Sequence, residues 1–333
     1  MNKQLTVVVP TYNVEKYIEQ CLSSFLVPEI LSELEVLIIN DGSTDRSAEI
    51  AERFVTKYPD TFRLINKENG GHGSAINRGI QEASGRYMKV VDSDDWVDGQ
   101  ALNTLVAFLR NSQSDLVVSR YYWVHEQTGK KKLEFEEPFA GVEYGKEYAF
   151  SEVSGKVFLK MHALTIRTKL LRRIPPIDEH CYYVDMEYVL FPIPQVRTIT
   201  FLEEVVYMYR IGLPGQSMDM SRMRKNEVNY DRVFNRLLAF YREQQEKGIP
   251  GYLLVYLEHV LGRMTATRMK IYLSFPFRWE IRAKMQRFDE NLKREYPNVY
   301  HAAIHQAVWL LRRSHYWLYP AEHLLFWIKE RKK

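Results

Sequence analysis

The stretch LTVVVPTYN, residues 5–13, joins a short apolar run to a polar one. The β-branched residues of 5–10 predict a buried strand, because short apolar runs that end in turn residues are typical of one. Apolar residues at helical spacing follow, and Asn13 is the expected N-cap of that helix. A buried strand that passes directly into a helix is the repeating unit of α/β proteins.

The same strand-then-helix order continues to about residue 119. We expect further strands at residues 35–41, 62–66, within 86–95 and at 115–119, with helices after Asp45, over 74–83 and over 101–110. This alternation predicts right-handed crossovers and a Rossmann-like, mostly parallel sheet with helices on both faces.

Polar residues follow each of the first four expected strands. They are Thr11, Tyr12 and Asn13 after the first, Asp41 after the second, Asn69, Gly70 and Gly71 after the third, and Asp92, Asp94 and Asp95 after the fourth. Sheets of this type bind ligands at the carboxyl ends of their strands. The sequence therefore predicts one site at this edge, with the acidic triplet at its centre.

The acidic triplet lies in VVDSDDW, residues 90–96. Two carboxylates spaced two residues apart, such as Asp92 and Asp94, cannot both be charged and desolvated without a counter-charge. A divalent cation is the simplest counter-charge, and Mg²⁺ or Mn²⁺ bound by oxygen ligands usually bridges to substrate phosphates. The alternative is a solvated helix start, where aspartates meet the positive end of the helix, and for Asp95 both interpretations stay open.

Several motifs in fixed order resemble the family 2 glycosyltransferases of the GT-A fold. They are PTYN, VEKYIEQCLSS, IINDGSTDRS, ENGGHGSAINRGI, SGRY and VDSDD. The resemblance is strong over residues 5–120 and fades after about residue 220. It implies an inverting transferase of the bacterial surface-glycan type, with a nucleotide-sugar donor, most often a UDP-sugar, and Mn²⁺ or Mg²⁺ as cofactor. The Gln-x-x-Arg-Trp signature of processive synthases is missing from the sequence, which indicates that one sugar is added per encounter.

The resemblance also assigns donor-site residues. Those implied to contact the donor nucleotide are Pro10, Tyr12, Glu15, Asp41, Asn69, Gly71, Asp92 and Ser93, and the implied metal ligands are Asp94 and Asp92. A tyrosine face suits stacking on a base, and a carboxylate accepts from a ring N–H. The alternatives are a packing aromatic at Tyr12 and a turn-forming Asp41 before Gly42.

The chain departs from the family pattern at two positions. The family often has Arg where this sequence has Ile76, and Arg78 or His72 is a candidate to replace it. The family commonly has Glu-Asp where this sequence has Val184-Asp185. The resemblance implies Asp185 as the catalytic base, with Glu187 as the second candidate and N-terminal helix capping by Asp185 as the alternative.

A strand and loop are expected at residues 205–218, behind the base. There the resemblance suggests that Arg210 and Ser217, like Glu187, contact the diphosphate or the acceptor. An Arg at a strand end is, in the alternative, a surface residue. The predicted organisation is a catalytic domain over 1–220, with nucleotide binding in 1–120 and the acceptor and base in 121–220, followed by a helical region over 221–333.

The 333 residues and two cysteines, Cys21 and Cys181, indicate a globular protein without a disulfide framework and favour a reducing, cytoplasmic compartment. The first ten residues hold one Lys before a short apolar run, so we expect no secretory signal, and no apolar stretch is long enough to predict a transmembrane helix.

Charge is unevenly distributed. Residues 221–333 hold 22 Lys and Arg against 11 Asp and Glu, a net charge of +11, while residues 1–220 carry −7. The last 33 residues contain Trp309, Trp317 and Trp327 with six Lys and Arg. Helices of this composition lie in membrane interfaces, which would place the protein at the inner face of the plasma membrane. The alternative is a helical subdomain that packs on the catalytic domain or on a second subunit of a homo-oligomer.

Two partner classes follow. We expect a nucleotide-sugar donor, and a glycan, lipid-linked glycan or cell-wall polymer as acceptor. We expect no nucleic-acid partner, because no nucleic-acid module is visible and the front half is acidic. A nucleotidyltransferase is an alternative enzyme, but the glycine-rich basic loop typical of that class is missing near PTYN. A non-catalytic sugar-nucleotide-binding scaffold is the other alternative, because Ile76 and Val184 replace family residues.

Overall fold

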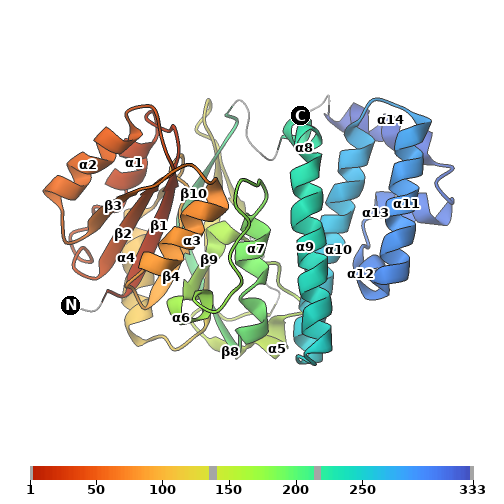
Figure 1. The fold of residues 1–333 in the computed structure, drawn as a ribbon. Coiled ribbons are helices and arrows are strands. Elements are labelled where there is room, and N and C mark those ends of the chain that lie inside the picture. The colour runs from red at the N-terminus through yellow and green to blue at the C-terminus, as the bar shows by residue number, and fades with distance from the viewer. Residues whose placement is uncertain (1–2, 135–140, 214–218, 331–333) are drawn as a thin grey trace. The chain divides into compact units, whose positions relative to one another are not determined.

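The computed structural model describes residues 3–134, 141–213 and 219–330. The chain forms two compact units, Met1–Pro214 and Gly215–Lys333 (Figure 1). The boundary between the units lies a few residues before the predicted one at 220.

One large sheet forms the centre of the first unit. Within the described residues it has ten strands in the order β3-β2-β1-β4-β9-β6-β10-β5, with β7 paired to β6 and β8 to β10. The strands are β1 (Leu5–Thr11), β2 (Leu34–Asn40), β3 (Phe62–Asn66), β4 (Tyr87–Val90), β5 (Trp96–Val97), β6 (Leu116–His125), β7 (Lys131–Glu134), β8 (Glu147–Ala149), β9 (Leu164–Arg167) and β10 (Thr198–Ile211). β1 is parallel to β2 and β4, and β9 runs antiparallel between β4 and β6. The predicted α/β fold with a mostly parallel sheet is confirmed.

Helices of the first unit connect and cover these strands. They are α1 (Ile18–Ser23), α2 (Ser47–Lys57), α3 (His72–Glu82), α4 (Gly99–Asn111), α5 (Phe150–Val153), α6 (Thr168–Leu171) and α7 (Asp185–Leu190), with short 3₁₀ turns η1 (Met161–Ala163) and η2 (Ile193–Gln195). The chain steps outward from β1 to β3 through α1 and α2, and α3 then carries it back to β4, on the other side of β1. Right-handed crossovers in opposite directions place α3 on the opposite face from α1 and α2, and the ends of β1 and β4 form the switch point where ligands bind.

A glycine sets how closely α3 approaches the sheet. A Cβ on Gly79 would lie 2.4 Å from a methyl carbon of Val8 in β1, so any larger residue would push the helix away. Both β1 and β2 are buried along their whole length, as their largely apolar sequences predict. The close packing of α3 on β1 holds the first turn of α3 beside the end of β4.

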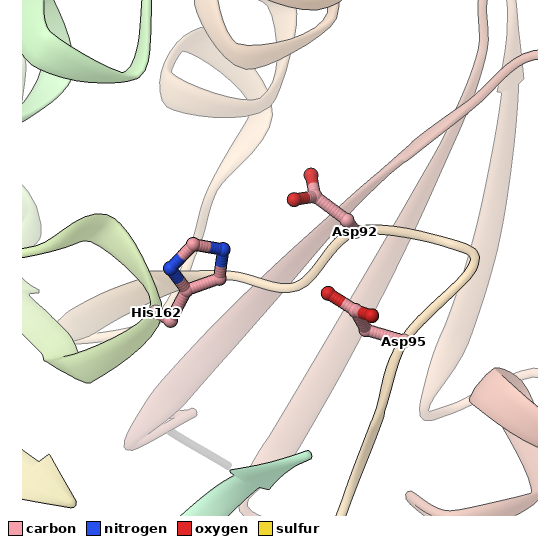
Figure 2. A group of neighbouring side chains, drawn as sticks. All are labelled: Asp92, Asp95 and His162. Atoms are coloured by element: carbon pink, nitrogen blue, oxygen red, sulfur yellow. The ribbon is translucent and has the colours of Figure 1, made fainter. Parts of the chain in front are cut away.

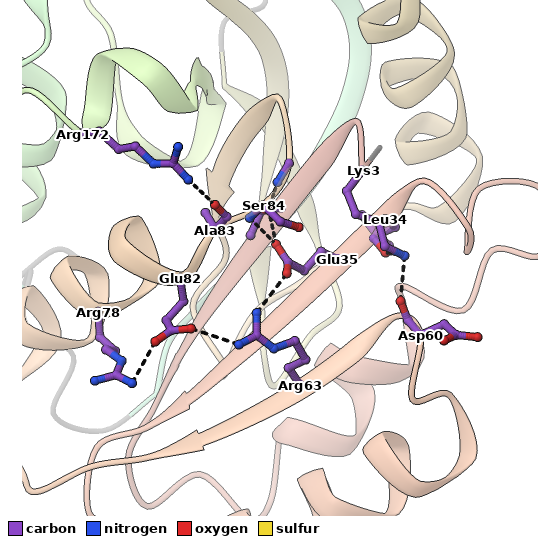
Figure 3. Close-up of polar contacts among 12 residues, drawn as sticks. Lys3, Leu34, Glu35, Asp60, Arg63, Arg78, Glu82, Ala83, Ser84 and Arg172 are labelled. Carbon is purple, nitrogen blue, oxygen red and sulfur yellow. Dashed lines mark hydrogen bonds and ion pairs between the residues drawn. The ribbon is translucent and has the colours of Figure 1, made fainter. Parts of the chain in front are cut away.

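At the end of the strands away from the predicted site, a buried carboxylate holds the sheet together (Figure 3). Glu35 accepts from the Thr6 hydroxyl at 2.6 Å, from Arg63 at 3.2 Å and from the Ser84 N–H at 2.8 Å. Arg63 also pairs with Glu82 at 2.9 Å. These contacts tie β1, β2, β3 and the end of α3 together at the end of the sheet away from the predicted site.

Two details of the sequence prediction are wrong. Asn13 does not cap the first helix, because α1 begins at Ile18 and its N-cap residue makes no side-chain bond. Asn13 instead has φ +52° and accepts from the Thr44 N–H at 2.8 Å, which ties the loop after β1 to the loop after β2. β6 extends well beyond the predicted residue 119, because it pairs with both β10 and β7 along its length.

The second unit is helical, as predicted. Its helices are α8 (Met220–Lys225), α9 (Glu227–Glu246), α10 (Gly251–Ser274), α11 (Trp279–Glu295), α12 (Pro297–Ala302), α13 (Gln306–Arg313) and α14 (Tyr319–Glu330). A Cβ on Gly262 would lie 2.5 Å from the backbone of Ala302, so α10 and α12 cross at close contact. Arg312 forms a buried ion pair with Asp289 at 2.7 Å, which links α13 to α11. Among the described residues, no helix is both long enough and apolar enough to span a bilayer.

Candidate active site

The acidic triplet lies in the turn after β4, at the switch point of the sheet. The Asp95 N–H donates to the Asp92 carbonyl at 3.0 Å and closes the turn. The buried Asp95 carboxylate accepts from the Tyr207 hydroxyl at 2.6 Å and from the Arg210 N–H at 2.7 Å, and the same Tyr207 oxygen accepts from the Asp92 N–H at 3.1 Å. β10 therefore fixes both ends of the turn, while the side chains of Asp92 and Asp94 stay partly exposed.

The side chain of Arg210 also holds the acidic turn. Its Nε donates to the Asp94 carbonyl at 2.6 Å and another guanidinium nitrogen donates to Gln20 at 2.7 Å, while a third pairs with Glu126. The guanidinium also lies over the rings of Tyr17 and Trp96. The residue is buried, so its structural task is to position the acidic turn. The predicted contact of Arg210 with a diphosphate stays a prediction.

A histidine from another part of the chain completes a group of metal-ligating side chains. Figure 2 shows the side chains of Asp92, Asp95 and His162 pointing toward one another, and one ligand atom from each lies within 4.8 Å of the others. His162 belongs to η1, whose backbone is held by buried Lys89, which donates to the His162 carbonyl at 2.6 Å and to the Leu164 carbonyl at 3.2 Å. Burial lowers the pKa of His162 to about 4, so the imidazole is neutral at pH 7, the form that binds a metal.

A second histidine contacts the same cluster. The Nε2 of His72, the first residue of α3, lies 2.8 Å from Asp92 Oδ1. Burial by itself would lower the pKa of His72, but the Asp92, Asp185 and Asp94 carboxylates raise it above its ordinary value. Burial acts to raise the pKa of Asp92, yet His72 holds it below its ordinary value. The pair therefore favours a charged Asp92 beside a protonated His72.

The pKa of Asp94 is shifted in the opposite direction from that of Asp92, while burial raises the pKa of Asp95 as well. Burial, reinforced by the Asp92 charge, raises the pKa of Asp94 to about 6. Its side chain lies outside the group formed by Asp92, Asp95 and His162. The sequence-based assignment of Asp94 as the main metal ligand stays a prediction, and the structure offers Asp95 and His162 as alternative partners of Asp92.

The glycine loop after β3 is organised by Asp41. The buried Asp41 carboxylate accepts from Lys67 at 2.6 Å, from the Gly70 N–H at 2.9 Å and from the Gly71 N–H at 2.7 Å. Asn69 donates to the Asp41 carbonyl at 2.9 Å. Gly71 has φ +84°, a conformation that favours glycine. Asp41 thus holds the loop that leads into His72, and its predicted bond to a base is untested.

The other predicted donor-site residues differ in accessibility. Tyr12 is 51% exposed just beyond β1, so its ring face is available for stacking. Glu15 accepts from the Arg46 N–H at 3.1 Å at the start of α2. Pro10 is buried in β1 and Ser93 is buried in the acidic turn. All four lie on loops or strand ends at the carboxyl edge of the sheet.

The predicted base lies at the start of α7. Burial raises the pKa of Asp185, His72 opposes that shift, and Asp92 adds to it. Such electrostatic coupling places Asp185 in the same polar cluster as His72 and Asp92. Val184 is the N-cap residue and makes no side-chain bond. Glu187 is fully buried and accepts from the Asp178 N–H at 2.7 Å, so the structure gives no support to its predicted contact with an acceptor.

The two candidates for the missing Arg at position 76 lie in different places. Ile76 is buried in the face of α3 that packs on the sheet. Arg78 pairs with Glu82 at 2.8 Å, one turn further along α3 (Figure 3). His72 contacts Asp92, so of the two it is the one at the acidic turn. Ser217 lies outside the described residues.

Comparison with known proteins identifies the family. The family model described as Glycosyl transferase family 2 matches residues 6–174. The chain belongs to glycosyl transferase family 2. The family assignment supports a glycosyltransferase enzyme, as predicted from the ordered motifs.

Curated relatives of this glycosyltransferase include three bacterial proteins. The chain is 37% identical over 129 residues to the glycosyltransferase GlyA of Streptococcus pneumoniae serotype 4, covering 39% of this chain and 18% of GlyA. It is 28% identical to the uncharacterised glycosyltransferase EpsJ of Bacillus subtilis, covering 71% and 69%. It is 26% identical to the minor teichoic acid biosynthesis protein GgaB of Bacillus subtilis, covering 78% of this chain and 29% of GgaB.

Solved structures confirm the GT-A type of fold. Staphylococcus aureus TarS residues 1–349, in complex with UDP-GlcNAc, is 19% identical with a TM-score of 0.56, covering 94% of this chain and 92% of that chain. The mannosyltransferase PcManGT of Pyrobaculum calidifontis, in complex with GDP-Man and Mn²⁺, is 16% identical with a TM-score of 0.54, covering 99% and 87%. At these identities the likeness establishes the fold of this family 2 member.

The group of possible metal ligands in this family 2 member, Asp92, Asp95 and His162, fits a divalent cation. Two carboxylates and a neutral imidazole are ligands that Mn²⁺ accepts, and Mg²⁺ prefers the oxygens. The buried Nδ1 of His162 has no hydrogen-bond partner within the part of the chain that the structure describes. A buried nitrogen without a partner is costly unless a ligand satisfies it.

Sequence reasoning missed His162 and His72 as members of the site. His162 lies in MHAL, a context that predicts a core residue, and only the pairing of β9 with β4 and β6 brings it to the acidic turn. The sequence predicted His72 only as a candidate to replace the missing Arg at position 76. Its position at the start of the helix that leads to β4 is the signal that could have placed it beside Asp92.

Proposed function

We propose that this glycosyltransferase moves a sugar from a UDP-sugar to a hydroxyl of a surface glycan, a lipid-linked glycan or a cell-wall polymer, with inversion at the anomeric carbon. The observation that carries the proposal is the gathering of Asp92, Asp95, His162, His72 and Asp185 at the switch point of the sheet. The UDP-GlcNAc named with TarS and the teichoic acid named with GgaB support this choice of donor and acceptor.

The donor nucleotide would lie along the ends of β1, β2 and β3. Tyr12 offers an exposed ring for the base. Asp41 holds the glycine loop so that its backbone can approach the nucleotide closely. Asp41 is already bonded to three donors, which leaves limited acceptor capacity for a ring N–H.

The cation would be held by Asp92 with Asp94, or by Asp92 with Asp95 and His162. When bound, it would neutralise charge that develops on the departing diphosphate. Arg210 and Tyr207 contribute by fixing the turn that carries these carboxylates. The raised pKa of His72 favours its protonated form, which would add positive charge beside Asp92.

Asp185 is the proposed base. A carboxylate whose pKa is raised by burial accepts a proton more readily than an exposed one, which suits deprotonation of an acceptor hydroxyl. The acceptor oxygen would then attack the anomeric carbon from the side opposite the diphosphate, so that the configuration inverts. Glu187 is buried behind Asp185 and serves to hold the loop at Asp178.

Thermal unfolding with UDP, GDP, CDP or TDP, each with and without Mn²⁺, tests the donor class. A nucleotide present at about 100 times its dissociation constant stabilises the fold by roughly 2.7 kcal/mol. We expect UDP with Mn²⁺ to stabilise the protein most, and release of UDP from UDP-sugars to identify the sugar. Stabilisation by GDP instead of UDP, or by none of the four, would contradict the proposed donor.

A further inference from the structure

Several large apolar side chains of the second unit are exposed to solvent. They are Phe277, Trp279, Trp317, Leu324, Leu325 and Ile328, and the last three, which belong to α14, we call the tail apolar face. Trp317 is 77% exposed and Leu324 is 61% exposed. Exposed apolar groups of this size, when they gather together, mark interaction surfaces.

The exposed aromatic residues lie close to α14 and are linked by direct contacts. The ring of Phe277 lies 5.3 Å from Trp279 and 5.4 Å from His323 of α14, measured between ring centroids. Arg282 lies 5.7 Å from the ring of Trp317 and 6.0 Å from that of Trp279. The aromatic residues at the start of α11 therefore adjoin the start of α14.

Helix α14 carries apolar residues on two opposite sides. Tyr319 and Phe326 pack in the core of this unit, and Glu322 is also buried. Leu324, Leu325 and Ile328 lie within about 100° of one another around the helix axis, on the roughly opposite side, and all are exposed. A helix on the surface of a globular protein normally points its apolar residues inward and its charges outward. This second apolar side of α14 therefore faces an environment other than the core of this unit.

Basic residues accompany the exposed aromatic and aliphatic groups. Arg282 lies over two of the tryptophans, and exposed Arg278 and Lys329 lie beside Phe277 and Ile328 in the chain. Residues 221–333 together carry a net charge of +11. Exposed tryptophan, aliphatic and cationic side chains on neighbouring helices match an anionic lipid surface, where rings sit at headgroup level and cations meet lipid charge.

We propose that the tail apolar face docks the protein on an anionic bilayer surface, inserting Leu324, Leu325 and Ile328 among the headgroups. The positive charge of the unit attracts anionic lipid and opposes contact between two copies through this face. Docking of this kind needs no helix that spans the membrane. It is independent of the sugar transferred and of the catalytic residues.

Vesicle flotation of the full chain tests the proposal. The probes are phosphatidylcholine vesicles that contain phosphatidylglycerol, and vesicles of phosphatidylcholine alone. We expect the protein to float with the anionic vesicles, to float poorly with the neutral ones, and to be released by high salt. Leu324→Glu should weaken partitioning about tenfold, because an inserted leucine is lost and an acid is gained.

A matched control separates insertion from bulk charge. Val228 in α9 is 75% exposed and lies outside the tail apolar face, and Val228→Glu changes the net charge by the same amount. We expect Val228→Glu to float like the wild type. Equal flotation of Leu324→Glu and Val228→Glu, or no flotation of the wild type with anionic vesicles, would overturn the proposal. So would light scattering that shows a dimer broken by Leu324→Glu without vesicle binding. Circular dichroism of each variant checks that it is folded.

Discussion

Arg210 and Asp95 are joined by a backbone contact at the centre of the site: the Arg210 N–H donates to Asp95 Oδ1 at 2.7 Å. The guanidinium of the same arginine donates to the Asp94 carbonyl at 2.6 Å. One residue of β10 thus fixes two consecutive residues of the acidic turn. The geometry of the predicted metal site depends on a strand more than a hundred residues later in the chain.

Arg210→Met should destabilise the protein and disturb the acidic turn. It leaves Glu126 without its cation and the Asp94 carbonyl without its donor, and we expect a loss of about 2–4 kcal/mol in the free energy of unfolding. Urea unfolding measures this loss. Arg110→Met, which breaks a solvent-exposed pair with Glu33, is the control and should cost far less stability than Arg210→Met. Equal losses would show that Arg210 has no special role.

Two substitutions decide which residues partner Asp92 in binding a cation. Suppose that the group formed by Asp92, Asp95 and His162 holds the ion. His162→Gln should then raise the Mn²⁺ concentration needed for UDP-dependent stabilisation at least about 10-fold, because even changes to residues around the metal ligands lower metal affinity by that much. Asp94→Asn should do so if the sequence-based assignment is right. Titration of Mn²⁺ against UDP-dependent thermal stabilisation measures both. Asp60→Asn is the control, because Asp60 is exposed and is not among the predicted site residues.

Asp185→Asn should abolish most transfer without preventing donor binding. Loss of a general base typically costs about 10²- to 10⁴-fold in rate. Stabilisation by UDP with Mn²⁺ should stay near the wild-type value, because Asp185 is not among the proposed donor contacts. Transfer measured with the matching UDP-sugar tests this expectation. Near-normal transfer by the variant would show that Asp185 is not the base.

Tyr12→Ala should weaken nucleotide binding by about 1–3 kcal/mol, the usual contribution of an aromatic ring stacked on a base. The ring is 51% exposed, so its removal should leave the unfolding midpoint without nucleotide almost unchanged. Isothermal titration with UDP gives the difference. Tyr144→Ala provides a comparison, because Tyr144 is exposed beside the amino-terminal half of β10. If both variants bind UDP like the wild type, stacking on Tyr12 is excluded.

Glu322→Gln should change how stability depends on pH. Burial raises the pKa of Glu322 above its ordinary value of 4.5, although Lys329 opposes the shift. The folded state therefore binds more protons than the unfolded state just above pH 4.5, so this group lowers stability as the pH rises through that range. In Glu322→Gln this decline disappears. Unfolding midpoints of both proteins between pH 4 and pH 7 should diverge, with the variant more stable at pH 7.

The sequence by itself determined the fold class and most elements of the first sheet. Short apolar runs rich in β-branched residues, such as residues 5–10 and 36–39, are typical of buried strands, and polar residues at their ends predict where a ligand site lies. The ordered motifs also predicted the family, because they determine which residue types occupy the loops around Asp41 and Asp92. Each of these signals lies within a short stretch of sequence, so it can be recognised without the tertiary structure.

Tertiary structure alone decided which side chains meet. His162 reaches Asp92 because β9 inserts antiparallel between β4 and β6, and Arg210 reaches the acidic turn because β10 is paired with β5. Neither pairing has a sequence spacing that predicts it. Asn13 failed as a helix cap because its side chain is bonded to Thr44 instead, a contact between two loops. The second, exposed apolar side of α14 likewise became visible only when burial showed that Tyr319 and Phe326 are the residues that pack on the helical core.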